Sequence, residues 1–243
     1  MVIDTSSRLD QVKVYLLKYI NQHGLKAKDQ LPSETAIAKT LGVSRNTLRE
    51  AYIELESEGV IIRRHGLGTF VARSPLIHDS LNDFSPFTQI IQESGFTPGF
   101  KTIAIDYGWA PADVRNVFSS PASQKVHRIK RLVLADRQPV IYVEDYLSPV
   151  MDWAGLQWDS FDGNMVQFIS SSLDHPLHHF LSHIRAASLT AEYSKYLQLD
   201  ANTPILSVRS ILYKEDNLPI LYSKMAFNSN IVELSFLRMI PKT

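Results

Sequence analysis

The chain has 243 residues and 44% hydrophobic side chains, which is enough for two domains or one large domain with a real core. It contains no cysteine, so disulfides and thiolate metal sites are excluded. The formal net charge is zero, yet residues 1–75 hold 11 Lys and Arg against 8 Asp and Glu, and the remainder holds 14 against 17. A basic N-terminal part followed by an acidic remainder suits a DNA-binding domain joined to a domain that does not contact DNA.

The N-terminal residues lack an apolar segment of signal-peptide length. No apolar run approaches the roughly 20 residues needed to span a bilayer. We therefore expect a cytoplasmic protein without membrane contacts.

The first third of the chain predicts three helices. An amphipathic helix is expected from Arg8 to His23. Ser33 can cap a second helix, which Gly42 ends, because glycine tolerates the left-handed conformation there. Ser44 can cap a third helix, which Gly59 closes. The buried face of this third helix is expected at i, i+3, i+4 and i+7, namely Leu48, Ala51, Tyr52 and Leu55.

Two β-rich segments follow the third helix. They run from Val60 to Arg64 and from Thr69 to Val71, and the four residues His65 to Gly68 between them can form a tight hairpin turn. The few residues between the second and third helices suit a helix-turn-helix. The hairpin then forms a wing beside it.

The third helix carries Arg45, Asn46 and Arg49 near its start, away from the apolar face. Arginine can bond a guanine edge and asparagine an adenine edge in the major groove. Arg63 and Arg64 in the hairpin could reach phosphates or a minor groove. A second interpretation stays open at this point, since helix-turn-helix units also occur in proteins that bind no DNA.

The motifs LPSE, LGVSRNTLREAYIELESEG and GLGTFV, the last after a basic pair, resemble the winged helix-turn-helix of the GntR family of bacterial transcription regulators. The resemblance implies operator contacts from the third helix, from the turn before the second helix and from the wing. Together with the exposed positions, the candidate DNA-binding residues are Ser33, Glu34, Thr35, Ser44, Arg45, Asn46, Thr47, Arg49, Arg63, Arg64, His65, Gly66 and Gly68.

The remaining chain predicts an α+β domain. A DNA-binding domain is expected over residues 1–75, a linker over 76–84 and a second domain over 85–243. The second domain mixes helices with strands that pair in hairpins, which favours an antiparallel sheet over a parallel one. Helices are expected over 84–94, 163–173 and 190–199, and strands over 101–109, 125–135, 138–146, 177–187, 205–213 and 220–227.

Two stretches of this domain are similar to each other. RLVLADRQPVIYVEDY and RSILYKEDNLPILYSKM both read as strand, turn and strand, with a proline just after the turn. We expect two hairpins of one antiparallel sheet, which an internal duplication would explain.

The same domain resembles the UTRA effector domain of the HutC branch of GntR regulators, whose fold is like chorismate lyase. The residues that carry the resemblance are Arg131-Leu132, Ala135-Asp136, Pro139, Glu144, Tyr146-Leu147, Glu192, Leu197, Pro204-Ile205-Leu206, Arg209 and Leu218-Pro219. It implies a small-molecule pocket between sheet and helices, and a homodimer.

The chain departs from the family pattern in two places. Val133 stands where sensors of phosphorylated sugars often carry a second arginine, and Phe227-Asn228-Ser229-Asn230 replaces a frequent Tyr-Arg-Gly-Asp. We expect an anionic or zwitterionic effector that is smaller or less charged than a sugar phosphate, such as an amino acid derivative, a carboxylate or a phosphonate.

Four residues are candidates for binding this effector. Arg131 and Glu144 lie on neighbouring strands of one predicted hairpin, where they form either a structural ion pair or a pocket pair that receives a ligand. Arg185 and Tyr222 are weaker additions. The residues Ser170-Ser171-Ser172 could hold an anion, or could simply end a helix.

The four histidines His175, His178, His179 and His183 raise the question of a metal site. On a strand, His179 and His183 would lie roughly 13 Å apart, too far to share one ion. We therefore expect no metal and no cofactor, and read the histidines as surface or pocket residues.

The sequence thus predicts a ligand-responsive transcription regulator, a repressor that binds a pseudo-palindromic operator as a homodimer and is released by a small-molecule effector. The alternative from another class is an enzyme with a chorismate-lyase-like domain, anchored to DNA by its N-terminal domain. No Walker loop, GxSxG, zinc-protease or kinase motif supports that alternative.

Overall fold

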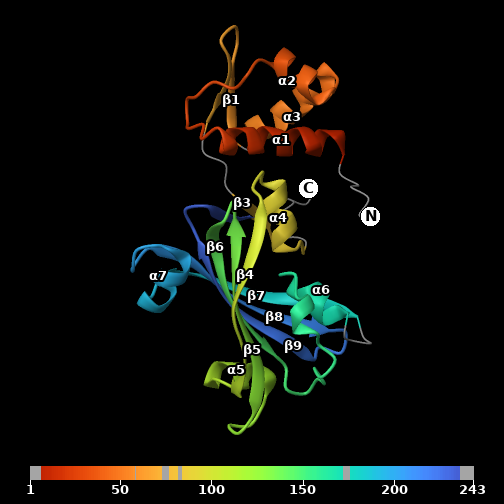
Figure 1. Cartoon of the computed structure of the whole chain (residues 1–243), viewed down its shortest axis with the longest axis vertical. Coiled ribbons are helices and arrows are strands. Elements are labelled where there is room, and N and C mark those ends of the chain that lie inside the picture. The colour runs from red at the N-terminus through yellow and green to blue at the C-terminus, as the bar shows by residue number, and fades with distance from the viewer. Residues whose placement is uncertain (1–6, 58, 73–76, 82–83, 172–175, 236–243) are drawn as a thin grey trace, which may run out of the picture. The chain divides into compact units, whose positions relative to one another are not determined.

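The computed structural model describes residues 7–57, 59–72, 77–81, 84–171 and 176–235 (Figure 1). The residues group into two compact units, and each is described by itself. One unit contains the chain up to Asp83, together with Gln89–Thr97 and the residues from Glu233 onward. The other contains Phe84–Thr88 and Pro98–Val232. The units are therefore discontinuous in sequence, unlike the predicted domains, whose boundaries stay a prediction.

Three helices begin the first unit, as the sequence predicts. They are α1 (Arg8–Gln22), α2 (Glu34–Leu41) and α3 (Arg45–Ser57). Ser7 and Asp10 form a reciprocal capping box at the start of α1. Gly42, with φ of 63°, ends α2 in the left-handed conformation.

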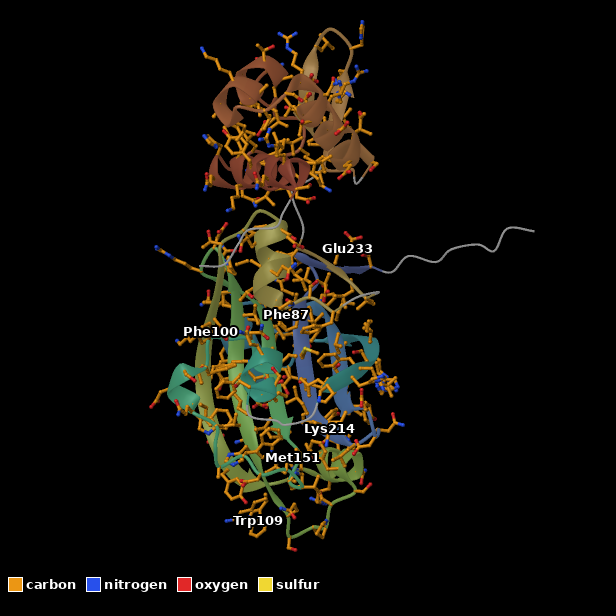
Figure 2. All side chains as sticks on the ribbon, turned by 90° about the vertical axis from the view of Figure 1, so that its right-hand side faces the viewer. Phe87, Phe100, Trp109, Met151, Lys214 and Glu233 are labelled. Carbon is orange, nitrogen blue, oxygen red and sulfur yellow. The ribbon has the colours of Figure 1, made fainter. Side chains whose placement is uncertain are left out.

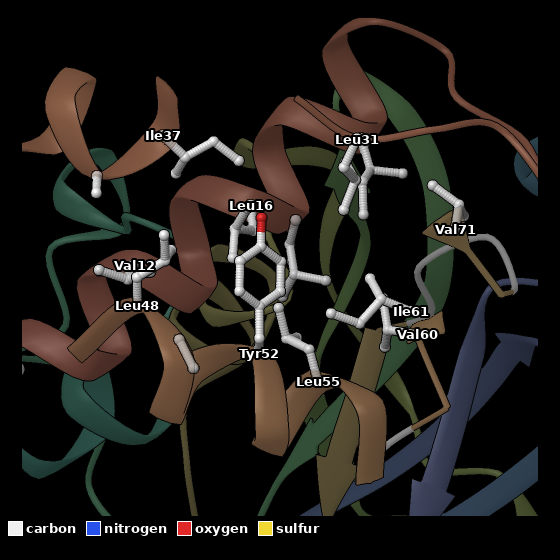
Figure 3. Packing of buried hydrophobic residues seen from close by; sticks show 14 residues of the cluster. Val12, Leu16, Leu31, Ile37, Leu48, Tyr52, Leu55, Val60, Ile61 and Val71 are labelled. Atoms are coloured by element: carbon white, nitrogen blue, oxygen red, sulfur yellow. The ribbon is translucent and has the colours of Figure 1, made fainter. Parts of the chain in front are cut away.

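The apolar faces of these helices meet in one core, which Figure 3 shows from close by. The predicted face of α3 is confirmed, since all four of its apolar residues are buried. Burying large apolar side chains of this kind contributes about 1.5–3 kcal/mol each. The core residues labelled in Figure 3 are Val12, Leu16, Leu31, Ile37, Leu48, Tyr52, Leu55, Val60, Ile61 and Val71.

The predicted wing is confirmed as the antiparallel strands β1 (Ile61–Arg64) and β2 (Gly68–Val71). The segment before α2 joins them, because Leu31 N donates to Thr69 O and Lys28 N donates to Val71 O. Figure 1 shows this hairpin projecting beyond the helices of its unit.

The predicted linker over residues 76–84 contains a strand, β3 (Ile77–Ser80), which pairs with β10 (Val232–Ser235) near the C-terminus. The predicted helix over 84–94 is present as α4 (Phe87–Glu93). None of the helices in the described ranges is long and apolar enough to cross a membrane.

The second unit is built on one antiparallel sheet of six strands in the order β4-β5-β6-β9-β8-β7. The two predicted hairpins form its centre, where β6 pairs with β9. The prediction of an α+β fold with an antiparallel sheet is confirmed. The strands are β4 (Pro98–Trp109), β5 (Lys125–Ala135), β6 (Gln138–Leu147), β7 (Leu177–Ser188), β8 (Pro204–Lys214) and β9 (Pro219–Asn228).

Helices cover both faces of this sheet. On one face, α5 (Ala112–Phe118) packs on Val126, Tyr146 and Tyr222, and α7 (Ala191–Leu197) packs near Tyr142. On the other face lie the 3-10 turn η1 (Trp158–Ser160) and α6 (Met165–Ser170), with a core of apolar residues. Figure 1 shows α7 and α6 on opposite sides of the strands. We call the face covered by α5 and α7 the α7 face, and the face covered by η1 and α6 the α6 face.

A β-bulge sets which residues of the β5–β6 hairpin share a face. Asp136 and Arg137 both have positive φ, as a two-residue hairpin turn of type I′ requires. Leu134 pairs with Pro139, but Val133 pairs with Ile141, so one extra residue enters β6. A shift of one residue moves every later side chain to the other face. The β8–β9 hairpin has a shift at the corresponding place, just after Pro219, which accords with a duplication.

Candidate nucleic-acid interface and effector face

The start of α3 presents polar side chains to solvent. Arg45, Asn46 and Arg49 are exposed, while Leu48 and Tyr52 on the opposite side are buried in the core. The buried side fixes the rotation of α3, and the exposed side is left for a partner. Because guanidinium and amide groups match base edges, this surface has the chemistry of a recognition helix.

Three of the predicted DNA-binding residues hold helix starts. Ser33 Oγ accepts a hydrogen bond from Ala36 N at 3.3 Å. Ser44 Oγ accepts one from Thr47 N at 3.1 Å, and the two hydroxyls lie 2.9 Å apart. Each cap contributes about 1 kcal/mol to its helix. Thr35, in contrast, is exposed in the first turn of α2.

The two wing arginines have different surroundings. Arg63 Nη2 lies 3.1 Å from Glu34 Oε1, so this pair ties the wing to α2. Arg63 N also donates to Glu56 Oε1 at 2.9 Å. The guanidinium of Arg64 lies over the ring of Phe70 and is otherwise exposed. Arg64 is therefore the wing arginine that faces solvent.

The wing turn depends on two glycines. Gly66 has φ of 74° and Gly68 has φ of 115°, which side chains other than glycine rarely adopt. A Cβ on Gly68 would lie 2.7 Å from Gln30 Nε2, which donates to Leu67 O at 2.8 Å. His65 is exposed beside this turn. The turn thus holds its polar tip in one conformation.

On the α6 face, Arg131 forms a buried pair with Asp145. Its Nε donates to Asp145 Oδ2 at 2.8 Å, and the two residues are only 4% and 0% exposed. Ser223 Oγ donates to the other carboxylate oxygen at 2.5 Å, and Arg131 Nη1 donates to the carbonyl of Gly163 at 3.2 Å. Charge and hydrogen bonding of the pair are thus largely satisfied within the unit.

Aromatic rings border the Arg131 guanidinium. It lies 5.9 Å from the ring centroid of Phe161, which packs edge-on against Phe100 and Phe168. Gly163 has φ of 96°, and a Cβ there would lie 2.7 Å from the ring of Phe100. Only glycine lets this loop approach the sheet so closely. Phe100 is labelled in Figure 2 and is 38% exposed, so the aromatic border reaches solvent.

A row of small polar side chains continues from Asp145 across the sheet. Asp145 pairs with Ser223, Ser223 with Ser210, and Ser210 with Ser182, on four adjacent strands. The hydroxyls of Ser182 and Ser210 lie 2.7 Å apart. The α6 face thus offers one buried cation, one carboxylate and three hydroxyls in a line.

Glu144 lies on the α7 face, with its own set of partners. It accepts hydrogen bonds from the Tyr142 and Tyr146 hydroxyls at 2.9 and 3.0 Å. Lys130 Nζ lies 3.3 Å from one carboxylate oxygen and Lys224 Nζ 4.0 Å from the other. Burial raises the pKa of Glu144, but the tyrosine hydrogen bonds and the two lysines outweigh it, and the pKa is lowered overall.

The predicted pairing of Arg131 with Glu144 is wrong. Glu144 lies opposite Lys130, and Arg131 lies opposite Val143. An unbulged two-residue hairpin would have put Arg131 and Glu144 on one face, and the extra residue in β6 separates them.

The other two effector candidates do not join Arg131 either. Tyr222 is buried opposite Tyr146 on the Glu144 side, and Arg185 is exposed on the edge strand β7. Sequence reasoning missed Asp145, Ser223 and Gly163. A carboxylate next to Glu144 in a strand must face the opposite way, and that alternation was the available signal.

The histidines do not form a metal cluster in the described part of the chain. His178 Nδ1 and His179 Nδ1 lie 2.9 Å apart, and the His179 ring stacks on Tyr213. His183 is exposed on the same strand. His175 lies outside the described residues, as does Ser172 of the predicted serine cluster. The hydroxyls of Ser170 and Ser171 donate to backbone carbonyls at the end of α6.

Two family models match the chain in tandem. The model described as bacterial regulatory proteins, gntR family, matches residues 9–71, and the UTRA domain model matches residues 93–233. The chain is 24% identical over 221 residues to the HTH-type transcriptional repressor NagR of Bacillus subtilis (strain 168), with 90% of each chain covered. It is also 24% identical over 225 residues to the probable fructoselysine utilization operon transcriptional repressor of Escherichia coli (strain K12), covering 92% of this chain and 91% of that protein.

Solved structures agree on the fold. The crystal structure of PhnF from Mycobacterium smegmatis matches with a TM-score of 0.66 and 23% identity, over 95% of this chain and 100% of that chain. The structure of the possible regulator YydK from Bacillus subtilis matches with a TM-score of 0.59 and 21% identity, over 96% and 100%. The relatives carry the names of regulators, so the alternative of a DNA-anchored enzyme is not supported. The chain belongs to the GntR family of bacterial regulatory proteins, as a transcription regulator with a winged helix-turn-helix and a UTRA domain.

Proposed function

We propose that the protein is a repressor that binds a pseudo-palindromic operator as a homodimer and leaves it when a small-molecule effector binds the UTRA domain. The exposed Arg45, Asn46 and Arg49 on a helix with a buried opposite face carry the proposal. Bacterial operators lie in the cytoplasm, and we place the protein there.

Within the DNA-binding unit we assign different roles to the candidate residues. Arg45, Asn46 and Arg49 would read bases, while Thr35, Arg64 and His65 would contact the backbone or a minor groove. The caps and the wing glycines would present backbone N–H groups to phosphates. We assign the Glu34–Arg63 pair to holding the wing against α2, because the two side chains already form an ion pair with each other.

For the effector we propose the α6 face around Arg131. Its hydrogen bonds to Asp145 and Gly163 use Nε and Nη1, and Nη2 carries two further N–H donors. A guanidinium fixed in this way suits a carboxylate or a related anion. Asp145 makes the pair neutral, and Val133 on the same face adds no charge. Both features favour a singly anionic or zwitterionic ligand whose polar groups follow the serine row.

Glu144 and Tyr222 fit a different role. Lys130 also lies 3.8 Å from Glu192 of α7, and Lys224 lies 3.2 Å from Asp113 of α5. The carboxylate of Glu144 thus sits at the centre of an ionic chain that ties both helices to the sheet. We propose that this chain holds the α7 face together and that the effector binds elsewhere.

The proposal is tested by selecting random-sequence duplex DNA with the full-length protein. A dimeric regulator should enrich an inverted repeat whose half-sites are centred about 10–10.5 base pairs apart, or a multiple of that. Enrichment of a single unrepeated motif would count against a dimer. No enrichment at all would count against sequence-specific binding.

A further inference from the structure

A cavity of about 240 Å³ opens on the α7 face, at the end of the sheet where β4 finishes and β5 begins. Asp106 lies opposite Arg128, and Arg128 lies opposite Tyr146, so three adjacent strands form one wall. Trp109, which is labelled in Figure 2, lines the cavity at this end of the sheet. Because Arg131 lies on the α6 face, the cavity is separate from the proposed effector site.

Gly108 leaves the space of the cavity open. It lies opposite Val126, so a side chain at this position would project onto the α7 face. Its φ is outside the left-handed region, and a Cβ added to it would have no heavy atom within 4 Å apart from its chain neighbours. Neither backbone conformation nor crowding therefore requires glycine here. The glycine provides the volume that a side chain would otherwise fill.

The floor of the cavity is apolar. Val126 and Tyr146 are each only 2% exposed, and the Tyr146 hydroxyl already donates a hydrogen bond to Glu144. Pro111 and the exposed Trp109 add further apolar lining. An engineered apolar cavity of about 150 Å³ holds benzene. The larger cavity in this protein therefore has room for one aromatic ring with a small substituent.

The polar side of the cavity is an ion pair without net charge. Arg128 Nη2 and Nε donate to the same oxygen of Asp106, Oδ2, at 2.7 and 3.3 Å. Within the described ranges, Arg128 Nη1 and Asp106 Oδ1 have no hydrogen-bond partner. The first is a donor and the second an acceptor. Because the two charges already cancel, a neutral group with an adjacent acceptor and donor complements the pair better than an ion does.

We propose that this cavity is a second ligand site, which takes a neutral planar aromatic molecule with an adjacent hydrogen-bond acceptor and donor, as in an aromatic primary amide or a nucleobase. The ring lies over Val126 and Tyr146. Its acceptor faces Arg128 Nη1, and its donor faces Asp106 Oδ1. The inference goes beyond the proposed function, because it depends neither on the binding of DNA nor on the effector at Arg131.

Benzamide is the probe that tests the site. Ligand-observed NMR with the full-length protein should detect binding, which is roughly millimolar for so small a molecule. Gly108→Leu should abolish this binding by filling the cavity, and should keep or raise the melting temperature, since glycine weakens a strand. Gly155→Leu is the matched control and should bind as the wild type does, because Gly155 is exposed in a turn and a Cβ there also meets no atom within 4 Å. Absence of binding to the wild type, or equal binding to Gly108→Leu, would overturn the inference.

The charge of Asp106 should decide which ligand the cavity prefers. The wild type should bind benzamide about tenfold more tightly than benzoate, because Asp106 repels a second carboxylate. Asp106→Asn removes that repulsion and leaves Arg128 without its counter-charge, so the order should reverse. Since benzoate can also bind near Arg131, only the binding that Gly108→Leu removes is compared, which keeps this test independent of the proposed effector site. A wild-type cavity that prefers benzoate would overturn the inference.

Discussion

Arg131 and Asp145 form an ion pair on the α6 face, with Nε and Oδ2 2.8 Å apart and both residues buried. Their sequence neighbours, Lys130 and Glu144, form a separate pair on the α7 face at 3.3 Å. One hairpin thus places one ion pair on each face of the sheet. The bulge after Pro139 decides which charge goes to which face.

Removing one partner of the buried pair should be costly. Asp145→Ala leaves the Arg131 guanidinium buried without its carboxylate, so the free energy of unfolding should fall by about 3–5 kcal/mol. Urea unfolding followed by circular dichroism measures the change. Asp106→Ala is the control, because its pair with Arg128 has side chains 43% and 36% exposed and should be worth about 0–1 kcal/mol. Equal losses in the two variants would contradict the account.

Glu144 should stabilise the protein only where it is ionised. Its pKa is lowered from 4.5 in the folded state, so its contribution is present above that pH and is lost as the pH falls through the folded pKa. Glu144→Gln lacks this ionisation. The difference in unfolding free energy between wild type and Glu144→Gln should therefore shrink as the pH is lowered from 6 toward 3. A difference that stays constant over that range would show that its charge is not involved.

Asp79 in β3, in contrast to Glu144, should destabilise the folded protein where it is ionised. Burial raises its pKa from 3.8 to about 6, so the folded state holds the proton more tightly than the unfolded state. Stability is then lost as the pH rises from about 4 to 6. Asp79→Asn should raise the unfolding free energy at pH 7 by roughly 1–2 kcal/mol, after allowance for partial exposure, and leave it unchanged below pH 4. If Asp79→Asn instead had a lower unfolding free energy than the wild type at pH 7, the ionised carboxylate would stabilise the folded state.

The helices of the DNA-binding unit were predictable from local signals. Caps and glycines fixed their ends, as Ser33 and Gly42 do for α2, and the 3.6-residue period fixed the buried face of α3. The strand β3 was not predictable in this way, because it pairs with β10 at the far end of the chain. The short helix α5 was also missed, although Val114 and Phe118 are spaced for one helical face.

Sequence reasoning failed mainly in assigning residues to the two faces of the sheet. Strand positions and hairpin turns were predicted well, since they follow from β-rich runs and turn residues. A bulge leaves no comparable mark in the sequence, yet it moved Arg131 and Glu144 to opposite faces. Site predictions that depend on two residues sharing a face therefore need the register as well as the strands.

Arg49→Ala should weaken operator binding without affecting the UTRA domain. If Arg49 reads a base, the cost should be about 1–3 kcal/mol and confined to certain sequences. If it grips phosphate, binding should weaken for all sequences and the salt slope should fall by about one. Mobility shifts at several salt concentrations separate the two. Arg137→Asn removes the same charge from the exposed β5–β6 turn and should leave affinity unchanged.

Arg131→Ala should abolish effector response while sparing DNA affinity. Small carboxylates, phosphonates and amino acid derivatives that raise the melting temperature of the wild type should not raise that of Arg131→Ala, because the anion-binding guanidinium is gone. Glu144→Gln is the control, since Glu144 lies on the other face and should keep the response. Release of the operator by Arg131→Ala at the wild-type effector concentration would place the ligand elsewhere.

The central claim is that two copies of the chain read the two halves of one inverted repeat through α3. Fluorescence anisotropy with the selected duplex, titrated under stoichiometric conditions, tests it most directly. Two chains should bind each duplex, and scrambling one half-site should sharply reduce affinity in the wild type. Saturation at one chain per duplex, with affinity unchanged when a half-site is scrambled, would contradict the claim.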